Sequence, residues 1–330
     1  MFSTQWRRGI ETQRKKRRIS LPQMRSGTGL DDFQYLLILD GLVCKHQTPQ
    51  RTGNAFMQDR ELPSDLAAIR ERYSSIYAII SPPRCGSTAF SRVFWEHPEL
   101  RYYCHEPFEV AYYDGAPLSA VVRKLEQPLH LDGVKLNAGS GGGEALLVKE
   151  MPYQVGRHFP LLSSLATGPL IFLIRDPRLS IASRMGKKQE VGDDPVFPLV
   201  ESGWQLLASQ IRYCRQRGIG HIVVDAKEFR NQPSEVFARV FGELGLDFQA
   251  GMLNWRSCAG VNLDNLQGRH RHLYERVLAS TGIEAEKKSI PPLEWFPKTR
   301  GFRDHVAESL KIYRELRRQS LGSTALDEGA

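Results

Sequence analysis

The amino-acid sequence predicts an α/β fold, a three-layer α/β/α sandwich around a central, mainly parallel sheet. Short apolar runs suited to buried strands recur from about residue 72 onward, and amphipathic helical patterns alternate with them. Because strand–helix alternation covers both faces of a parallel sheet with helices, the two observations together indicate this architecture. The predicted strands lie in the runs Ile76–Ile80, Leu146–Val148, Leu170–Ile174 and His221–Val224.

Each predicted helix combines an apolar stripe with a boundary signal. The first, Thr88–Glu96, carries apolar side chains on one face and stops before Pro98, which disfavours further helix. Glycine after an apolar stripe is a typical helix end, and Gly218 has that position. The later helices are expected to run from Trp204 to Gly218, from about Pro233 onward, and near Asp304–Arg318.

The segments outside this alternation suggest one folded domain with extensions. We expect a basic, flexible N-terminal tail over residues 1–30, an N-terminal extension over 31–73, the domain itself over 74–320, and a flexible C-terminal tail over 321–330. Two stretches inside the domain have the character of insertions. Residues 111–145 include the glycine-rich AGSGGG (Ala138–Gly143), a hinge or flexible loop, and residues 259–300 are polar and punctuated by prolines.

Composition favours a cytoplasmic protein with an anionic ligand. The 330 residues carry a net charge of +8, and the five cysteines are odd in number and form no CxxC pair, which fits a reducing compartment. The apolar segment Tyr35–Leu39 is too short to span a bilayer, so no membrane partner is expected. The basic tail is interpreted as a solvated segment rather than an arm for nucleic acid or acidic lipid. Oligomeric state stays open.

The stretch IISPPRCGSTAF (Ile79–Phe90) has the parts of a phosphate cradle: a buried strand, a glycine turn, two hydroxyls and a helix beginning. The free N–H groups and positive dipole end of that helix favour an anion, and Arg84 adds a full charge. The stretch lacks the lysine of the nucleotide-hydrolase pattern GxxxxGK[ST]. The candidate binding residues are Pro83, Arg84, Cys85, Gly86, Ser87 and Thr88.

SPPRCGSTAF resembles the 5′-phosphosulfate-binding loop of the sulfotransferases that use 3′-phosphoadenosine 5′-phosphosulfate (PAPS), with Arg84 where lysine is commoner. LIFLIRDPRLSIASRM (Leu170–Met185) is similar to the 3′-phosphate site of that family, which makes Arg175 and Ser183 its candidate residues. The late stretch FPKTRGF resembles the loop that covers the 3′-phosphate. It adds the candidates Lys298, Thr299, Arg300 and Gly301.

This resemblance covers roughly residues 74–305 and implies a fold like that of the P-loop nucleotide kinases, with PAPS as co-substrate and no metal. LVKEMPY is similar to the family's strand-end lysine followed by proline, which makes Lys149 a candidate for stabilising charge on the leaving phosphate, together with Arg84. The acceptor is expected to be a hydroxyl or amine of a small-molecule or sugar-like compound, held by the two insertions.

The general base is expected in CHEPFEVAYY (Cys104–Tyr113). In family members acting on sugars and related acceptors a glutamate falls here, and Glu106 lies twenty-two residues after Arg84. The histidine base of the cytosolic small-molecule branch is missing, since its place is taken by Lys149-Glu150-Met151. His105 is the alternative base or a residue that orients Glu106, and Glu109 is interpreted as a solvated carboxylate.

Several readings stay open from the sequence. A divergent phosphotransferase of the same fold, or a non-catalytic scaffold that binds anions or RNA, is the alternative function. The only histidine cluster, RHRH (Arg269–His272), is interpreted as a solvated helix start. Four aromatic residues either stack on the acceptor or pack in the core: Tyr112, Tyr113, Trp255 and Trp295.

Overall fold

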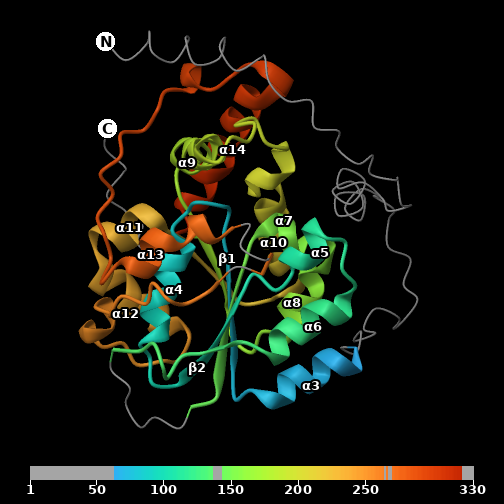
Figure 1. The fold of residues 1–330 in the computed structure, drawn as a ribbon, viewed down its shortest axis with the longest axis vertical. Helices are drawn as coiled ribbons and strands as arrows, with labels where there is room; N and C mark the ends of the chain where they lie inside the picture. The colour runs from blue at the N-terminus through green and yellow to red at the C-terminus, as the bar shows by residue number, and fades with distance from the viewer. Residues whose placement is uncertain (1–62, 137–142, 264, 267–269, 322–330) are drawn as a thin grey trace, which may run out of the picture.

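The computed structural model describes residues 63–136, 143–263, 265–266 and 270–321 (Figure 1). The predicted tail over residues 1–30 lies outside the described residues, as does most of the extension over 31–73. The same holds for the C-terminal tail after residue 321 and for the glycine-rich stretch apart from Gly143. Within the described part of the chain, no helix has the length and apolar character that crossing a membrane requires.

The sheet has six strands in the order β3-β2-β4-β1-β5-β6. Five of them run parallel, and only the short β3 pairs antiparallel, with β2 at one edge. The predicted mainly parallel sheet is therefore confirmed. The strands are β1 (Ile76–Ile80), β2 (Leu100–His105), β3 (Leu129–His130), β4 (Ala145–Glu150), β5 (Leu170–Ile174) and β6 (His221–Asp225).

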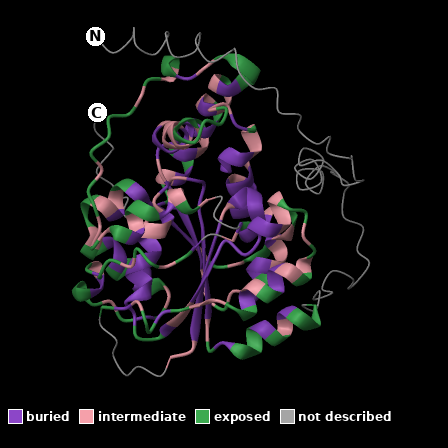
Figure 2. Ribbon diagram, in the orientation of Figure 1, coloured by how far each residue is buried: buried purple, intermediate pink, exposed green. Residues whose placement is uncertain are grey.

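Burial of both sheet faces explains why the strands read as continuous apolar runs. Along β1, Ile76, Ala78 and Ile80 belong to one hydrophobic cluster, whereas Tyr77 and Ile79 belong to the other. Successive side chains of a strand point to opposite faces, so a strand between two helical layers needs apolar residues at every position. Figure 2 shows the central strands of the sheet buried and most exposed residues on the outer helices and loops. The short edge strand β3 is the exception, with Leu129 half-buried and His130 exposed.

Helices cover both faces, as the alternation predicts (Figure 1). One face is covered by α4 (Ser87–Trp95), α11 (Ala226–Asn231), α12 (Pro233–Glu243) and α13 (Glu275–Ala279). The other layer consists of α3 (Ser64–Arg72), α5 (Glu109–Tyr113), α6 (Leu118–Glu126), α7 (Pro152–Val155), α8 (Phe159–Leu165), α9 (Pro177–Glu190), α10 (Trp204–Arg217) and α14 (Phe302–Arg317).

The predicted helix boundaries agree with α4, α10, α12 and α14 to within one or two residues. The insertion at 111–145 differs from its expected loop character, because it contains α6 and β3. Val121, Val122 and Leu125 of α6 are buried against the main core, which gives the segment an apolar face and holds it as a helix. The insertion at 259–300 has little regular structure beyond α13 and short 3-10 turns.

The parallel arrangement brings the carboxyl ends of β1, β2, β4 and β5 to one edge of the sheet. In the register of the neighbouring strands, Ile80 of β1 lies opposite Glu150 of β4, and His105 of β2 lies opposite Lys149. Ligands of open α/β sheets bind at this edge, outside the strand ends. The loops that follow these four strands are therefore the place to look for a site.

Candidate active site

A cavity of about 950 Å³ lies at the carboxyl edge of the sheet. Its volume suits a nucleotide-sized ligand with room for a second small molecule. Most of the predicted site residues line it, although they come from four strand ends and from helix α9. These residues are Pro83, Arg84, Gly86, Ser87, Thr88, Glu106, Lys149, Arg175 and Ser183.

The loop after β1 presents the beginning of α4 to the cavity. Gly86 is the residue before the helix and has a φ of 88°, a left-handed conformation that favours glycine. A Cβ atom at this position would lie 2.9 Å from Nη2 of Arg230, so the guanidinium packs directly on the loop. Ser87 and Thr88 open the helix and line the cavity, and their helical turn has free N–H groups. An anion fits this position.

Arg84 connects the two predicted phosphate sites. Its Nε donates to Oγ of Ser183 at 3.3 Å, and its carbonyl oxygen accepts a hydrogen bond from Nη1 of Arg175 at 2.8 Å. Burial lowers the pKa of Arg84, and the like charge of Arg175 lowers it further. Two closely spaced guanidinium groups favour a ligand with more than one negative charge.

Three non-glycine residues of the described chain have positive φ angles, and all three lie in predicted site motifs. They are Arg84 (64°), Glu106 (48°) and Arg300 (54°). This conformation costs about 1–2 kcal/mol for an L-residue. Such strain is kept where the surrounding structure enforces it, and it clusters at functional sites. Backbone geometry therefore singles out Arg84 and Glu106 independently of their side chains.

Glu106 follows β2 directly and is fully buried at the cavity wall. Lys149 forms an ion pair with its Oε1, and Nε2 of His105 lies 3.2 Å from the same oxygen. The other carboxylate oxygen, Oε2, accepts a hydrogen bond from Nε2 of Gln154 at 2.8 Å. The phenol of Tyr274 lies 3.5 Å from Oε1. The carboxylate is thus held in one orientation by donors on several sides.

The charge state of Glu106 follows from these neighbours. Burial alone would raise the pKa of its carboxyl group, but the charge of Lys149 and the contact with His105 outweigh burial. The pKa is therefore held well below its usual range, and the group is ionised at neutral pH. An ionised carboxylate at the wall of a cavity can accept a proton from a bound ligand.

The turn that carries Glu106 is fixed by neighbouring strands. Its amide donates to the carbonyl of Lys149 at 2.7 Å, and Nδ2 of Asn265 donates to its carbonyl at 3.2 Å. The buried Glu150 carboxyl group accepts the amide of Phe108 at 2.6 Å and that of Met151 at 2.9 Å. These bonds join the ends of β2 and β4 and hold the positive φ of Glu106 in place.

A segment of the second insertion closes the cavity over the cations. Residues 284–288 line the cavity, and Glu286 forms an ion pair with Nη2 of Arg175. Nη1 of Arg230 donates to the carbonyl of Glu284 at 2.5 Å. The side chains of Arg175 and Glu286 are only 11% and 19% exposed, so this pair lies largely inside the protein. An anionic ligand that binds Arg175 would therefore have to compete with the Glu286 carboxylate for the Arg175 guanidinium.

Some predicted residues do not line the cavity. Cys85 is fully buried beneath the loop, and burial raises the pKa of its thiol to about 12. The stretch Lys298–Gly301 forms a 3-10 turn before α14 and lies outside the cavity lining, with Arg300 3.5 Å from Asp194. The role of these residues at a phosphate stays a prediction. Of the four aromatic candidates, Tyr113 lines the cavity, whereas Trp255 is a core residue.

Several residues that line the cavity were not predicted to be site residues. Glu109, expected to be a solvated carboxylate, has a side chain that is only 1% exposed, and His270 lies 2.5 Å from its Oε1. The interpretation of the RHRH cluster as a solvated helix start is corrected for His270, whose side chain is 20% exposed. Their burial depends on the second insertion folding back over α5, which no local pattern indicates. The other unpredicted lining residues include Gln154, Arg184, Arg230, Tyr274 and Glu286.

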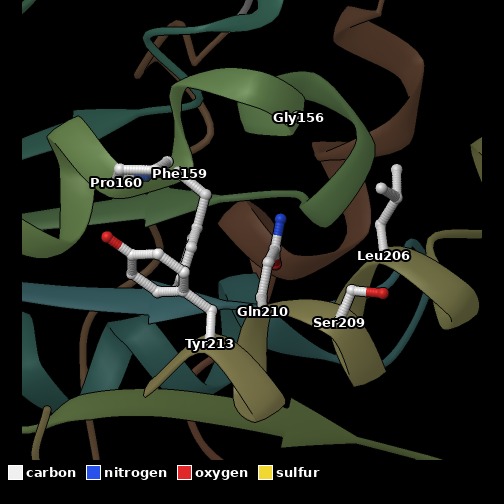
Figure 3. A pocket seen from close by; sticks show the side chains of 7 residues that line it. All are labelled: Gly156, Phe159, Pro160, Leu206, Ser209, Gln210 and Tyr213. Atoms are coloured by element: carbon white, nitrogen blue, oxygen red, sulfur yellow. The ribbon is translucent and has the colours of Figure 1, made fainter. Parts of the chain in front are cut away.

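A second, much smaller cavity lies between α8 and α10 (Figure 3). It measures about 10 Å³, which is space for no more than about one water molecule. Its lining is mainly apolar, and it shares no residue with the cavity at the strand ends. The residues that line it are Gly156, Phe159, Pro160, Leu206, Ser209, Gln210 and Tyr213. It is a packing defect rather than a ligand site.

The fold and the site together define a class, an α/β protein with a glycine turn and the beginning of a helix after strand β1, and a buried glutamate–lysine ion pair in the same cavity. The family follows from sequence comparison. Residues 76–302 match the sulfotransferase domain family, and this match spans well over half of the 330-residue chain. The chain therefore belongs to the sulfotransferases, and its reaction class is sulfuryl transfer. No curated protein sequence shows a significant match.

Comparison with solved structures found matches to proteins that are named as sulfotransferases. A sulfotransferase domain from the curacin biosynthetic pathway is 17% identical over 72% of this chain and 97% of that chain, with a TM-score of 0.43. The sulfotransferase domain of the Synechococcus PCC 7002 olefin synthase is 15% identical over 74% and 96%, with a TM-score of 0.40. Mouse sulfotransferase SULT7A1 complexed with PAP is 12% identical over 80% and 95%, with a TM-score of 0.41.

Proposed function

We propose that the protein transfers the sulfuryl group of PAPS to a hydroxyl or amine of a small-molecule acceptor, with Glu106 as the general base. The observation that carries the proposal is the placement of an ionised, buried carboxylate beside Lys149 in the same cavity as the phosphate-type loop. A base at one end of a cavity and an anion cradle at the other are the two parts that transfer from an anionic donor needs.

The cationic part of the cavity fits the two ends of PAPS. The helix beginning at Ser87, together with Arg84, would hold the 5′-phosphosulfate, and Arg175 with Ser183 would hold the 3′-phosphate. PAPS supplies an activated sulfuryl group whose bond to the 5′-phosphate breaks during transfer. The hydrogen bonds that join Arg84 to Ser183 and Arg175 set the spacing between the two sites.

Glu106 would accept the proton of the acceptor hydroxyl as its oxygen forms the new bond to sulfur. The bond from sulfur to the 5′-phosphate oxygen breaks in the same reaction, and that phosphate keeps the electron pair. Arg84 and Lys149 are placed to stabilise the added negative charge on the phosphate. The products are the sulfated acceptor and 3′-phosphoadenosine 5′-phosphate (PAP).

The ion pair between Lys149 and Glu106 makes the strength of the base depend on the donor. With Lys149 as its countercharge, Glu106 has a lowered pKa and is a weak base. When the Lys149 ammonium turns toward the phosphate oxygen that gains charge, Glu106 loses part of that countercharge, so its pKa rises. The base is then strongest when a proton must be removed.

The first test of this function is ligand binding followed by transfer. Calorimetry should show tight binding of PAP without added metal, and labelled PAPS should transfer its label to members of an acceptor panel. Tight binding of ATP–Mg²⁺ in preference to PAP would instead favour the alternative function, a phosphotransferase. Loss of function on deletion of residues 1–25 would favour the anion-binding scaffold instead.

Replacing Glu286 with glutamine should strengthen PAP binding by roughly three- to tenfold, because the carboxylate no longer competes for Arg175. Titration calorimetry of the wild type and the variant measures the difference directly. Glu284→Gln is the matched control on the same segment. Its side chain is 53% exposed and pairs with the exposed Arg276, so we expect little change in affinity. Unchanged or weaker binding in Glu286→Gln would contradict the competition.

A further inference from the structure

The wall of the cavity next to Glu106 carries two buried oxygen atoms that lack hydrogen-bond partners among the described residues. They are Oε1 of Gln154 and Oε2 of Glu109. Gln154 is 4% exposed and Glu109 is 1% exposed, and both line the cavity. Unpartnered buried oxygens are rare in native proteins, because each loses its hydrogen bonds to water. A ligand that donates hydrogen bonds would satisfy both.

The orientation of the Gln154 amide is determined by its neighbour. The Glu106 carboxylate is ionised and only accepts hydrogen bonds, so the amide nitrogen of Gln154 must face it, at 2.8 Å from Oε2. The Gln154 oxygen therefore points away from Glu106, on a side chain that lines the cavity next to the base. It is a buried acceptor that has no partner among the described residues.

Glu109 is fixed in a similar way. Its Oε1 is 2.5 Å from Nδ1 of His270, and its amide donates to the Glu106 carbonyl at 3.0 Å. Glu109 is thus the first residue of α5, one turn after Glu106. Its second carboxylate oxygen, Oε2, has no hydrogen-bond partner among the described residues. The negative charge of Glu106 lies close by and adds to burial in raising the pKa of Glu109. The ionised carboxylate of Glu106 at this end of the cavity repels an anionic acceptor.

Apolar and aromatic surface completes this end of the cavity. Tyr113 and Tyr153 line it, with their hydroxyls 3.0 Å apart, and Tyr274 lies over the Glu106 carboxylate. Aromatic rings beside fixed hydrogen-bond acceptors suit a ligand with an apolar C–H face and several hydroxyl groups. A flat hydrophobic phenol has no further hydroxyl to donate to the free oxygens of Gln154 and Glu109.

We propose that Gln154 and Glu109 form a subsite whose two free oxygens accept hydrogen bonds from hydroxyl groups near the one that is sulfated, so that the acceptor is a neutral polyol. This inference rests on the proposed function and narrows its acceptor. Glu106 removes the proton of the reacting hydroxyl, whereas Gln154 and Glu109 each bind another hydroxyl of the same molecule. The pair sets specificity and orientation rather than the chemistry itself.

The test compares acceptors that differ by one hydroxyl group. The probes are p-nitrophenyl β-D-glucopyranoside, its four monodeoxy analogues and, as mono-hydroxyl acceptors, cyclohexanol and p-nitrophenol, each assayed with labelled PAPS. In the wild type, loss of at least one hydroxyl other than the one that is sulfated should lower kcat/KM by about tenfold or more. In Gln154→Met or Glu109→Gln the same loss should have an effect of less than about threefold.

The ratio of kcat/KM for an acceptor to kcat/KM for its deoxy analogue separates a change in specificity from a loss of general-base catalysis by Glu106. Gln154→Met also removes a hydrogen bond to Glu106, but that change lowers the rates of both acceptors together. Asp193→Asn is the control, since its 59% exposed side chain lies at the rim of the cavity, and all ratios should stay as in the wild type.

The possible failures are distinguishable. If every analogue that keeps the sulfated hydroxyl reacts like its parent, or if discrimination among these analogues persists in both variants, the subsite is wrong. Transfer to the mono-hydroxyl acceptors alone, or PAP binding without transfer to any probe, also overturns the polyol inference but leaves the donor site intact. Only the absence of both PAP binding and transfer would overturn the proposed function with it.

Discussion

Replacement of Glu106 by glutamine should reduce sulfuryl transfer by about a thousand-fold, which is the usual contribution of a general base. The amide has nearly the same shape as the carboxyl group, but it cannot take up the proton. PAP binding should remain close to that of the wild type, because the phosphate-binding residues lie in other loops. Single-turnover rates with labelled PAPS and calorimetry with PAP measure the two effects separately. Near-normal turnover would remove Glu106 from the base role.

Loss of stability is the alternative cause of low activity in Glu106→Gln. Removing one member of a buried ion pair leaves Lys149 without its countercharge, which costs about 3–5 kcal/mol in comparable cases. The double variant E106Q/K149M removes both charges and should recover thermal stability. If the double variant is as stable as the wild type, binds PAP and is still inactive, unfolding is excluded as the cause, and the loss reflects the chemical roles of Glu106 and Lys149 together.

Replacement of Arg175 by alanine should weaken PAP binding by roughly 100-fold, since a hydrogen bond to a charged partner contributes about 1.5–3 kcal/mol. Adenosine 5′-phosphosulfate, which lacks the 3′-phosphate, should lose far less. AMP provides the closest comparison with PAP, because the two ligands differ only in that phosphate. Equal losses for all three ligands would show that Arg175 does not bind the 3′-phosphate.

Part of the effect of Arg175→Ala comes from Glu286. Once Arg175 is removed, the Glu286 carboxylate remains in the cavity without its countercharge and repels the incoming phosphate. The double variant R175A/E286Q should therefore recover part of the lost affinity. A double variant no better than Arg175→Ala would mean that the segment moves away from the site when its ion pair is broken.

The proposed phosphate-binding part of the site could be predicted from the sequence because its signals are local. A buried strand, a glycine with positive φ and a helix beginning occupy twelve consecutive residues, and their order gives the position of the anion site. The strands themselves are equally local, since a strand buried on both faces is apolar at every position. The resemblance to the sulfotransferases then predicted that Arg84, Arg175 and Ser183 belong to one site, and the structure brings them together in the cavity.

The acceptor side of the site is not visible in the same way. Glu109, Gln154 and His270 come from three separate segments, and their burial depends on the insertion at 259–300 folding over α5. No periodicity or motif indicates that contact, so Glu109 reads as a surface carboxylate from the sequence alone. The Arg175–Glu286 ion pair joins residues 111 positions apart and is hidden for the same reason.

The positive φ of Arg84 places opposing selection pressures on one position. A glycine there would relieve the backbone strain and remove a partly buried cation that lies beside Arg175. It would also remove the hydrogen bonds from the Arg84 side chain to Ser183 and to the carbonyl of Leu273. The same change would remove the charge that would link the two proposed phosphate sites. Backbone strain and the proposed binding of the donor therefore make opposite demands on position 84, and Arg84→Gly is expected to exchange donor binding for a less strained backbone.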